Sequence, residues 1–154
     1  MNSGYTIRAA ERSDLLALLK LLADDPLGKM REQPADPIPQ AYVDAFDTIT
    51  RDPQQQLVVL AAGAELVGCL QLTFIPGLSR RGMWRSQIES VRIARQQRGQ
   101  GLGRRLLEWA IEHSRQRGCG LVQLTSDKRR GDAAEFYEAL GFTASHEGFK
   151  LSLD

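Results

Sequence analysis

Three closely spaced glycines, Gly99, Gly101 and Gly103, have the spacing in this sequence that most directly indicates chemistry. They follow a basic turn and lead into a segment with helical periodicity. Glycine lets the backbone approach a ligand closely. The first N–H groups of a helix have no partner within it, and the helix dipole adds positive charge there. The stretch therefore predicts an anion site, and phosphate is the expected group.

Two common phosphate-binding motifs do not match this stretch. A Walker A loop needs Lys and then Ser or Thr after its last glycine, whereas Arg104 and Arg105 follow Gly103. A dinucleotide fingerprint needs a third glycine where Arg104 stands, and an acidic residue about 20 residues further on in a strand context. What remains is the pattern R-x-x-G-x-G over residues 98–103.

The strand expected before the glycines, Met83–Ala94, carries an irregular alternation. Ile88 lies on one side of it, while Val91 and Ile93 lie on the other. A regular strand cannot bury all three on one face. We therefore expect a β-bulge at residues 89–90, which would leave backbone groups unpaired for a ligand. A strand buried on both faces is the alternative.

The stretch IESVRIARQQRGQGLG resembles the acetyl-CoA loop of the GNAT superfamily of N-acetyltransferases. A second segment, DAAEFYEALGF at residues 132–142, is similar to the A-x-x-F-Y-x-x-x-G-F pattern of that family, in the expected order and separation. The resemblance covers residues 85–142. It implies an α+β class, GNAT-like acyl-CoA N-acyltransferase fold, in which a mostly antiparallel sheet is splayed at its centre and carries helices on both faces.

The resemblance also implies acetyl-CoA as the cosubstrate and an amine as the acceptor. The backbone at Val91, Arg92 and Ile93 would pair with the pantetheine arm like an added strand. The amides of the turn would hold the pyrophosphate, and they belong to Arg98, Gly99, Gln100, Gly101, Leu102, Gly103 and Arg104. The chain departs from the family where many members carry Asn after the fifth strand, because it has Ser126, Asp127 and Arg130 there.

Two side chains would carry protons in the reaction that the resemblance implies. Tyr137 occupies the position near the CoA sulfur, where a hydroxyl can protonate the departing thiolate, and Glu89 matches a position where many members carry the general base. An alkylamine is mostly protonated at neutral pH and attacks only when neutral, so a carboxylate must accept a proton. A solvated or ion-paired carboxylate and a core tyrosine are the structural alternatives.

Periodicity and turn residues place the elements around this site. Strands are expected at Tyr5–Ala9, Leu57–Ala62, Leu66–Ile75, Met83–Ala94, Leu121–Thr125 and within Phe142–Leu153. Helices are expected from the caps Ser13 and Asp14 to Asp24, and over Gln40–Thr50, Gly101–Arg117 and Asp132–Leu140. Four prolines and no period indicate a long loop over Asp25–Pro39.

Length and composition predict a single N-acetyltransferase domain over residues 1–154. The chain is 42% hydrophobic and 25% charged, as is usual for a soluble globular protein. Without a long apolar run or a signal peptide, we expect a cytoplasmic protein with no membrane partner. Cys69, Cys119, His113 and His146 lack metal-ligand spacing, so no metal is expected and the cysteines are interpreted as small buried hydrophobes.

Charge is unevenly distributed along the chain. Residues 80–130 hold 13 Lys or Arg against 4 Asp or Glu, while residues 24–52 hold seven acids. This favours a phosphate-bearing cosubstrate and a cationic amine acceptor, such as a polyamine, an amino sugar or a basic peptide end. The arginines lack interleaved aromatics, so nucleic acid is not expected. A catalytically silent acyl-CoA sensor is the alternative function, and a homodimer stays open.

Overall fold

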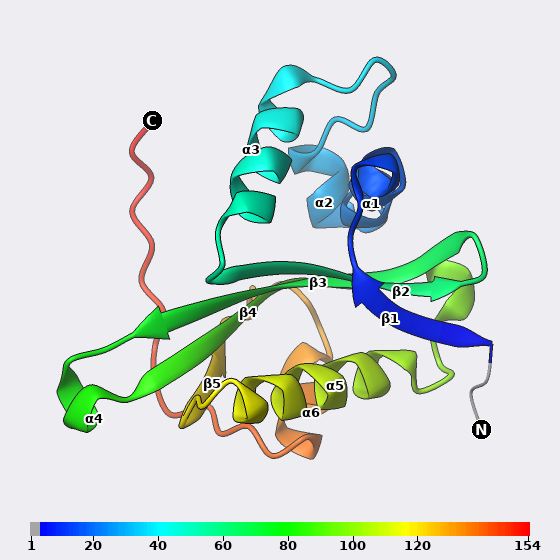
Figure 1. Cartoon of the computed structure of the whole chain (residues 1–154). Helices are drawn as coiled ribbons and strands as arrows, with labels where there is room; N and C mark the ends of the chain where they lie inside the picture. The colour runs from blue at the N-terminus through cyan, green and yellow to red at the C-terminus, as the bar shows by residue number, and fades with distance from the viewer. Residues whose placement is uncertain (1–3) are drawn as a thin grey trace. The chain divides into compact units, whose positions relative to one another are not determined.

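The computed structural model describes residues 4–154, which form two compact units, one ending at Gln123 and the other spanning Leu124–Asp154. The first unit is built on a five-stranded sheet with the order β1-β2-β3-β4-β5 (Figure 1). Its strands are β1 Tyr5–Ala9, β2 Gln55–Ala62, β3 Glu65–Pro76, β4 Trp84–Ile93 and β5 Leu121–Leu124. Spatial order follows chain order, with tight connections between β2, β3 and β4 and helical connections from β1 to β2 and from β4 to β5.

The first four strands form an antiparallel meander. The fifth strand breaks this alternation, because it runs in the same direction as its neighbour β4. Gly120 donates its N–H to the Trp84 carbonyl at 2.9 Å, and Gln123 lies beside Gln87 with its side-chain nitrogen 2.8 Å from the Gln87 oxygen. Because both contacts join residues that are equally far apart in the sequence, β5 is parallel to β4, and the sheet is mixed.

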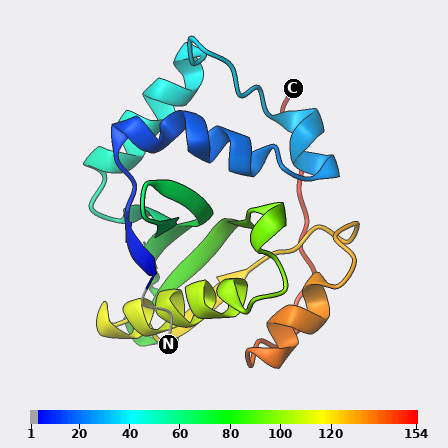
Figure 2. The same ribbon diagram turned by 90° about the vertical axis from the view of Figure 1, so that its right-hand side faces the viewer.

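Helices cover both faces of this sheet (Figure 1). One face carries α1 Leu15–Leu22, α2 Pro26–Arg31 and α3 Gln40–Arg51, and the opposite face carries α5 Leu102–Gln116. Figure 2 shows α1 and α3 side by side on their face of the sheet, with α5 on the other. Short turns complete the unit, namely η1 Arg12–Asp14, α4 Ser79–Gly82 and η2 Arg95–Gln97. The expected α+β architecture is confirmed.

Apolar side chains at helical spacing hold these layers together. Leu15 and Leu19 of α1 pack with Phe46 of α3, and Leu18 of α1 packs on Val59 and Cys69 of the sheet. On the opposite face α5 buries an apolar stripe made of Leu102, Leu106, Leu107 and Ala110. Fully burying a leucine is worth about 1.5–3 kcal/mol, so each stripe fixes its helix against the sheet.

The segment expected as a long loop contains a helix, α2. The Asp25 carboxylate accepts the N–H of Gly28 at 2.6 Å, which caps the helix. Pro26 occupies the first turn, where its missing N–H leaves no bond unmade. The loop prediction was wrong here because the first of its four prolines starts a helix.

Asp14 also differs from expectation, since its carboxylate does not cap α1. It accepts hydrogen bonds from Arg8 Nη1 at 2.8 Å and Nη2 at 3.1 Å, and from the backbone N–H of Glu11 at 2.7 Å. The Arg8 guanidinium is the main cause that lowers the pKa of Asp14. The helix itself ends at Leu22, short of the expected Asp24.

The second unit contains helix α6, Ala133–Ala139. The expected final strand or strand pair within Phe142–Leu153 is wrong, since no residue described after Leu124 is in a strand. The alternating apolar residues Phe149, Leu151 and Leu153 are 92%, 85% and 92% exposed. Alternation gives a segment strand tendency, but a strand also needs a partner for its backbone groups, and this unit supplies none.

Candidate active site

The bulge expected in β4 is present. Cys69 pairs with Arg92 and Gln71 pairs with Glu89, so two residues of β4, Ser90 and Val91, lie opposite one residue of β3. Ser90 has φ +57°, a left-handed conformation that is uncommon for a residue other than glycine. Such strain persists only where the surrounding structure imposes it, and it is enriched at functional sites.

Beyond the bulge, β4 has an open edge. Gln123 lies beside Gln87 and β5 ends one residue later, so β5 does not flank the last part of β4. Ala94 donates its N–H to Val67 of β3 at 2.8 Å, and by alternation the backbone groups of Val91 and Ile93 point away from β3. The sheet is therefore splayed where the resemblance implies an added strand.

Two arginines occupy carbonyls along this edge. The Ile93 carbonyl accepts Arg98 Nε at 3.1 Å, and the Val91 carbonyl accepts Arg92 Nη1 at 2.9 Å. The Arg98 bond ties the glycine turn, residues 98–104, to the end of β4. The structure thus brings Val91, Arg92, Ile93 and the start of the turn together, as the sequence predicts.

The glycine turn has the geometry of an anion cradle. Gly99 and Gly101 have φ +82° and +77°, and apart from their two chain neighbours no atom lies within 4 Å of the position that a Cβ would take at either residue. The first hydrogen bond within α5 runs from the Arg105 N–H to the Gly101 carbonyl at 3.1 Å, so the N–H groups of residues 102–104 precede it. These donors and the open space fit the pyrophosphate of acetyl-CoA.

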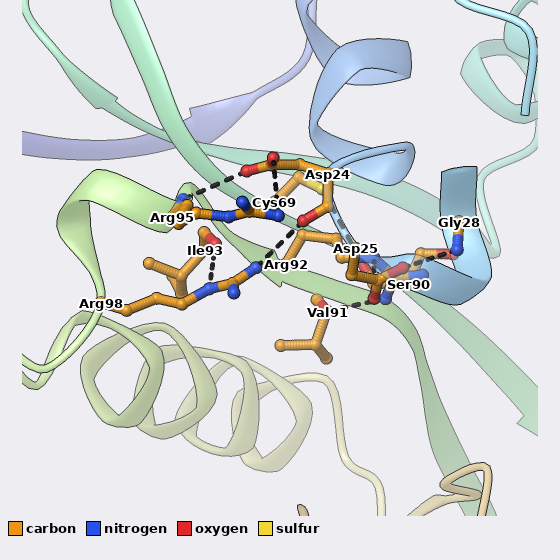
Figure 3. Close-up of polar contacts among 10 residues, drawn as sticks. All are labelled: Asp24, Asp25, Gly28, Cys69, Ser90, Val91, Arg92, Ile93, Arg95 and Arg98. Carbon is orange, nitrogen blue, oxygen red and sulfur yellow. Dashed lines mark hydrogen bonds and ion pairs between the residues drawn. The ribbon is translucent and has the colours of Figure 1, made fainter. Parts of the chain in front are cut away.

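Acidic residues after α1 fasten this turn from the other side (Figure 3). Asp24 accepts the Arg95 N–H through Oδ2 at 3.1 Å, and its carbonyl accepts Arg98 Nη2 at 3.3 Å. Asp25 lies 3.7 Å from Arg92 Nε, with both side chains nearly buried at 12% and 15% exposure. Losing one partner of such a pair leaves a buried charge, so the pair fixes the end of β4 firmly.

In the sequence Asp24 and Asp25 are part of an acidic region, and nothing there indicates this role. Their partners are about 70 residues away in the sequence, so no local pattern indicates the contacts. Other acids of that region also have local partners. Glu32 accepts the Tyr42 hydroxyl, Asp44 accepts Gln40 and Asp52 accepts the Gln54 N–H.

The Glu89 side chain is exposed, on the strand residue just before the bulge. Its Oε1 accepts a hydrogen bond from Gln87 Nε2 at 2.7 Å. Residues two apart in a strand share a face, and Glu89 therefore lies on the face opposite to buried Ser86 and Ile88. Those two residues face α5, where the Ser86 hydroxyl lies 2.7 Å from that of Ser114.

Tyr137 lies in α6 of the second unit. Its ring contacts Phe136 edge-on at 5.1 Å and Phe142 at 5.9 Å between centroids. The ring is half-buried and packs with these neighbours. This packing holds the ring and leaves the predicted role of the hydroxyl as a prediction.

Neither cysteine has the character of a nucleophile. Cys69 is buried, and burial raises the pKa of its thiol to about 12. The thiol donates to the Ser90 carbonyl at 3.5 Å, which helps to hold the bulge. Burial also raises the pKa of the Cys119 thiol. Nucleophilic cysteines need a lowered pKa, so both behave here as small hydrophobes.

An apolar cavity of about 150 Å³ adjoins the bulge between the sheet, α1 and α3. Leucines of α1 and residues Tyr42 and Phe46 of α3 line it, and Cys69, Gln71 and Ser90 contribute from the sheet.

Within residues 4–154 no three His, Cys, Asp or Glu side chains gather as metal ligands. Over the same residues no helix is both long and apolar enough to cross a bilayer.

A splayed strand with a bulge, followed by a glycine turn that starts a helix, agrees with one family. Residues 16–142 match the family model described as the acetyltransferase (GNAT) family. The chain belongs to this family. The match includes both segments on which the resemblance was based, and GNAT enzymes use acetyl-CoA.

Curated GNAT relatives have related activities. The chain is 32% identical over 114 residues to an aminoalkylphosphonate N-acetyltransferase of Salmonella typhimurium, covering 74% of this chain and 73% of that protein. It is 30% identical over 151 residues to a glucosamine 6-phosphate N-acetyltransferase of Trypanosoma brucei brucei, covering 96% and 95%. This GNAT chain is accordingly an acetyl-CoA-dependent N-acetyltransferase.

A solved structure shares the whole fold. A Bacillus halodurans protein described as a transcriptional regulator is 50% identical, with a TM-score of 0.95 and coverage of 97% of this chain and 99% of that one. A putative acetyltransferase from Agrobacterium tumefaciens is 27% identical with a TM-score of 0.81, covering 96% and 99%.

Proposed function

We propose that this GNAT enzyme transfers the acetyl group of acetyl-CoA to a primary amine of a small molecule or peptide by direct attack in a ternary complex. The observation that carries the proposal is the bulge at Ser90, which sits on the open edge of β4 and leads within a few residues to the glycine turn. This arrangement offers one continuous binding surface for acetyl-CoA, from its pyrophosphate to its acetyl group.

Backbone groups along this surface bind the cosubstrate. The outward groups of Val91 and Ile93 pair with the pantetheine amides, with Arg92 between them fixed by Asp25. The N–H groups of Arg98, Gly99, Gln100, Gly101, Leu102, Gly103 and Arg104 surround the pyrophosphate. The carbonyls of Val91 and Ile93 accept arginine side chains in this structure, and the second lone pair of each oxygen can accept an N–H of the pantetheine.

Acetyl-CoA supplies an acyl group with a good leaving thiolate, and the protein supplies orientation and proton transfer. Glu89 accepts the proton that the attacking amine must lose, directly or through a water. The outward N–H of Val91 donates to the oxygen on which negative charge develops. The Tyr137 hydroxyl protonates the departing thiolate. Holding the two substrates in one orientation contributes to the rate beside these groups.

Two observations favour acceptors of opposite charge. The acidic region at residues 24–52 favours a cationic amine, but Asp24 and Asp25 are paired with arginines there. The two curated relatives are named for amines that carry a phosphonate or a phosphate. We therefore place amino-phosphonates and amino-sugar phosphates first in a substrate panel, followed by polyamines, amino sugars and basic peptides.

The panel is assayed by release of free CoA thiol from acetyl-CoA at low and high salt. We expect turnover with at least one amine. If electrostatic attraction helps to bind a charged acceptor, high salt should raise the KM for that acceptor. Binding of acetyl-CoA without turnover of any amine would favour the catalytically silent sensor. Because the Bacillus halodurans relative is described as a regulator, a DNA-binding titration belongs in the same series, and we expect no salt-dependent binding.

Several coarser features belong to the same proposal. The family match runs across both compact units, which supports residues 1–154 acting as one catalytic domain. We propose a cytoplasmic enzyme that works without a metal. A homodimer is compatible with it and is tested by the mass in solution.

A further inference from the structure

A row of hydrogen-bonded side chains leads across the sheet to Glu89. Gln123 of β5 donates its side-chain N–H to Gln87 Oε1 at 2.8 Å, and Gln87 donates to Glu89 Oε1 at 2.7 Å. Gln87 and Gln123 are half-buried, whereas Glu89 is exposed. The sequence offers no motif for this row, since Gln123 is 36 residues from Gln87.

The chemistry of the groups fixes the direction of these bonds. An ionised carboxylate can only accept, so the amide nitrogen of Gln87 must face Glu89. The Gln87 oxygen then faces β5, and Gln123 must present its nitrogen to it. Only one orientation of each amide satisfies both bonds.

Such a row restrains the carboxylate that the proposed function uses as a base. A free glutamate side chain has high rotamer entropy, and an exposed one samples many positions. The bond from Gln87 engages Oε1 and leaves Oε2 to face an acceptor. When the amine loses its proton, the proton moves from nitrogen to Oε2, and the resulting carboxylic acid still accepts the Gln87 bond through Oε1.

We infer that Gln87 and Gln123 are positioning residues for the reaction, which hold the Glu89 carboxylate beside the bulge in the orientation that accepts the proton of the amine. The inference rests on the proposed function of Glu89. It assigns Gln123 a role at a distance, because it contacts Gln87 and acts on Glu89 only by orienting that amide.

The direction of the bonds suggests the decisive variant, Gln123→Glu. A carboxylate at this position accepts only, so it draws the Gln87 nitrogen toward itself, turns the amide over and presents the Gln87 oxygen to Glu89. The bond to Glu89 is then lost although Gln87 and Glu89 are unchanged. Gln123→Met removes the same partner without imposing the turn.

We expect Gln123→Glu to lower kcat about tenfold with little change in KM for acetyl-CoA, and Gln123→Met to lower it less than about threefold. A purely structural role would make the apolar variant at least as harmful as the near-isosteric one. Gln54→Glu is the matched control, because it makes the same change of charge at a half-buried glutamine of the first unit that does not contact this row. It should retain the wild-type kcat.

A double-mutant cycle links the effect to the carboxylate. In a Glu89→Gln background, Gln123→Glu should lower kcat no further, since there is no ionised base left to misorient. Additive losses, or a wild-type kcat in Gln123→Glu alone, would overturn the inference.

A second measurement does not depend on turnover. In ¹H–¹⁵N spectra of the side-chain amides, the Gln87 NH₂ resonances should shift in both Glu89→Met and Gln123→Glu and stay in place in Gln54→Glu. If the Gln87 NH₂ resonances stay in place in both Glu89→Met and Gln123→Glu, the hydrogen-bonded row does not exist and the inference fails. Absence of acetyl transfer by the wild-type enzyme overturns the proposed function instead, so the two failures are distinguishable.

Discussion

Ser90 connects the chemistry of this enzyme to its backbone. Its left-handed conformation inserts one residue into β4, which turns Val91 and Ile93 toward the open edge. The Cys69 thiol stabilises the bulge by donating to the Ser90 carbonyl. Burial raises the pKa of this thiol to about 12, so it stays protonated at physiological pH. The bulge is thus supported by a buried, protonated thiol.

The hydroxyl of Tyr137 offers the cleanest single-atom test of proton transfer. Tyr137→Phe keeps the ring, so its edge-on contacts with Phe136 and Phe142 and the stability of α6 should be unchanged. Because the departing thiolate loses its proton donor, we expect kcat to fall about 100-fold. Steady-state kinetics give kcat, and calorimetry should give an unchanged affinity for CoA.

A wild-type kcat in this variant would assign thiolate protonation to water. Comparison with Glu89→Gln then separates the two ends of the reaction. In the proposed reaction the carboxylate acts on the attacking amine, so its loss should matter most at acidic pH, where more of the amine is protonated.

The strand, turn and helix from β4 to α5 form the element on which the proposed binding of the cosubstrate depends. The strand supplies an open edge, the turn supplies two glycines with left-handed backbone, and α5 supplies its first N–H groups. Arg98 ties the turn to the Ile93 carbonyl, and Asp24 holds both Arg95 and Arg98. The turn is therefore held in shape by contacts with two other segments.

Gly101→Asn tests this element at a small cost in backbone strain. Asparagine tolerates the left-handed conformation, and nothing lies within 4 Å of the added Cβ, so the protein should lose about 1 kcal/mol of stability or less. A ligand that approaches the backbone would meet the new side chain. We expect CoA affinity, measured by calorimetry, to fall about tenfold or more, which corresponds to about 1.4 kcal/mol.

Gly118 supplies the matched control for this substitution. It also has a positive φ, +85°, with open space around its Cβ position, and it lies just past the other end of α5. Gly118→Asn should therefore bind CoA like the wild type. Equal affinities in the two variants would remove the turn from the proposed binding site.

Stability of the whole first unit depends on how α5 packs on the sheet. His113 of α5 stacks on Trp109 at 4.8 Å and contacts Phe74 of β3 at 6.0 Å between ring centroids. Burial, and then the charge of Arg117, lower the pKa of His113. Arg117 itself lies over the Phe74 ring at 4.0 Å, so the histidine and the arginine share one apolar surface.

This packing predicts a pH dependence of folding. The unfolded chain takes up a proton at His113 near pH 6.5, the ordinary value, whereas the folded chain takes it up only at lower pH. Between these values the unfolded state binds more protons, so the free energy of unfolding should fall as pH drops below about 6.5. Urea unfolding of the wild type and of His113→Phe from pH 7.5 to 5.5 measures the difference, and the variant should show the shallower slope.

Parallel slopes in the two proteins would show that His113 is hydrated in the folded state. Phenylalanine retains the ring contacts with Trp109 and Phe74, so the comparison isolates the titration. Values below pH 5 are left out of the comparison because Asp14, whose pKa is lowered by Arg8, begins to contribute there.

Local patterns in the sequence determined the family, the strands β1 to β4, the position of the bulge and the glycine turn. Each of these depends on residues within one or two adjacent elements, where alternation, glycine and helix periodicity act directly. The parity of Ile88 against Val91 and Ile93 indicated the bulge because a strand has only two faces.

The tertiary structure decided what depends on contacts between distant residues. It paired Asp24 and Asp25 with the arginines of the turn, joined Gln123 and Gln87 to Glu89, and left Phe149, Leu151 and Leu153 without a strand partner. A carboxylate in the sequence looks the same whether it attracts a substrate or holds a neighbouring loop. Only the fold determines which charges and hydrogen-bond donors meet, because those energies depend on distances between atoms and on burial.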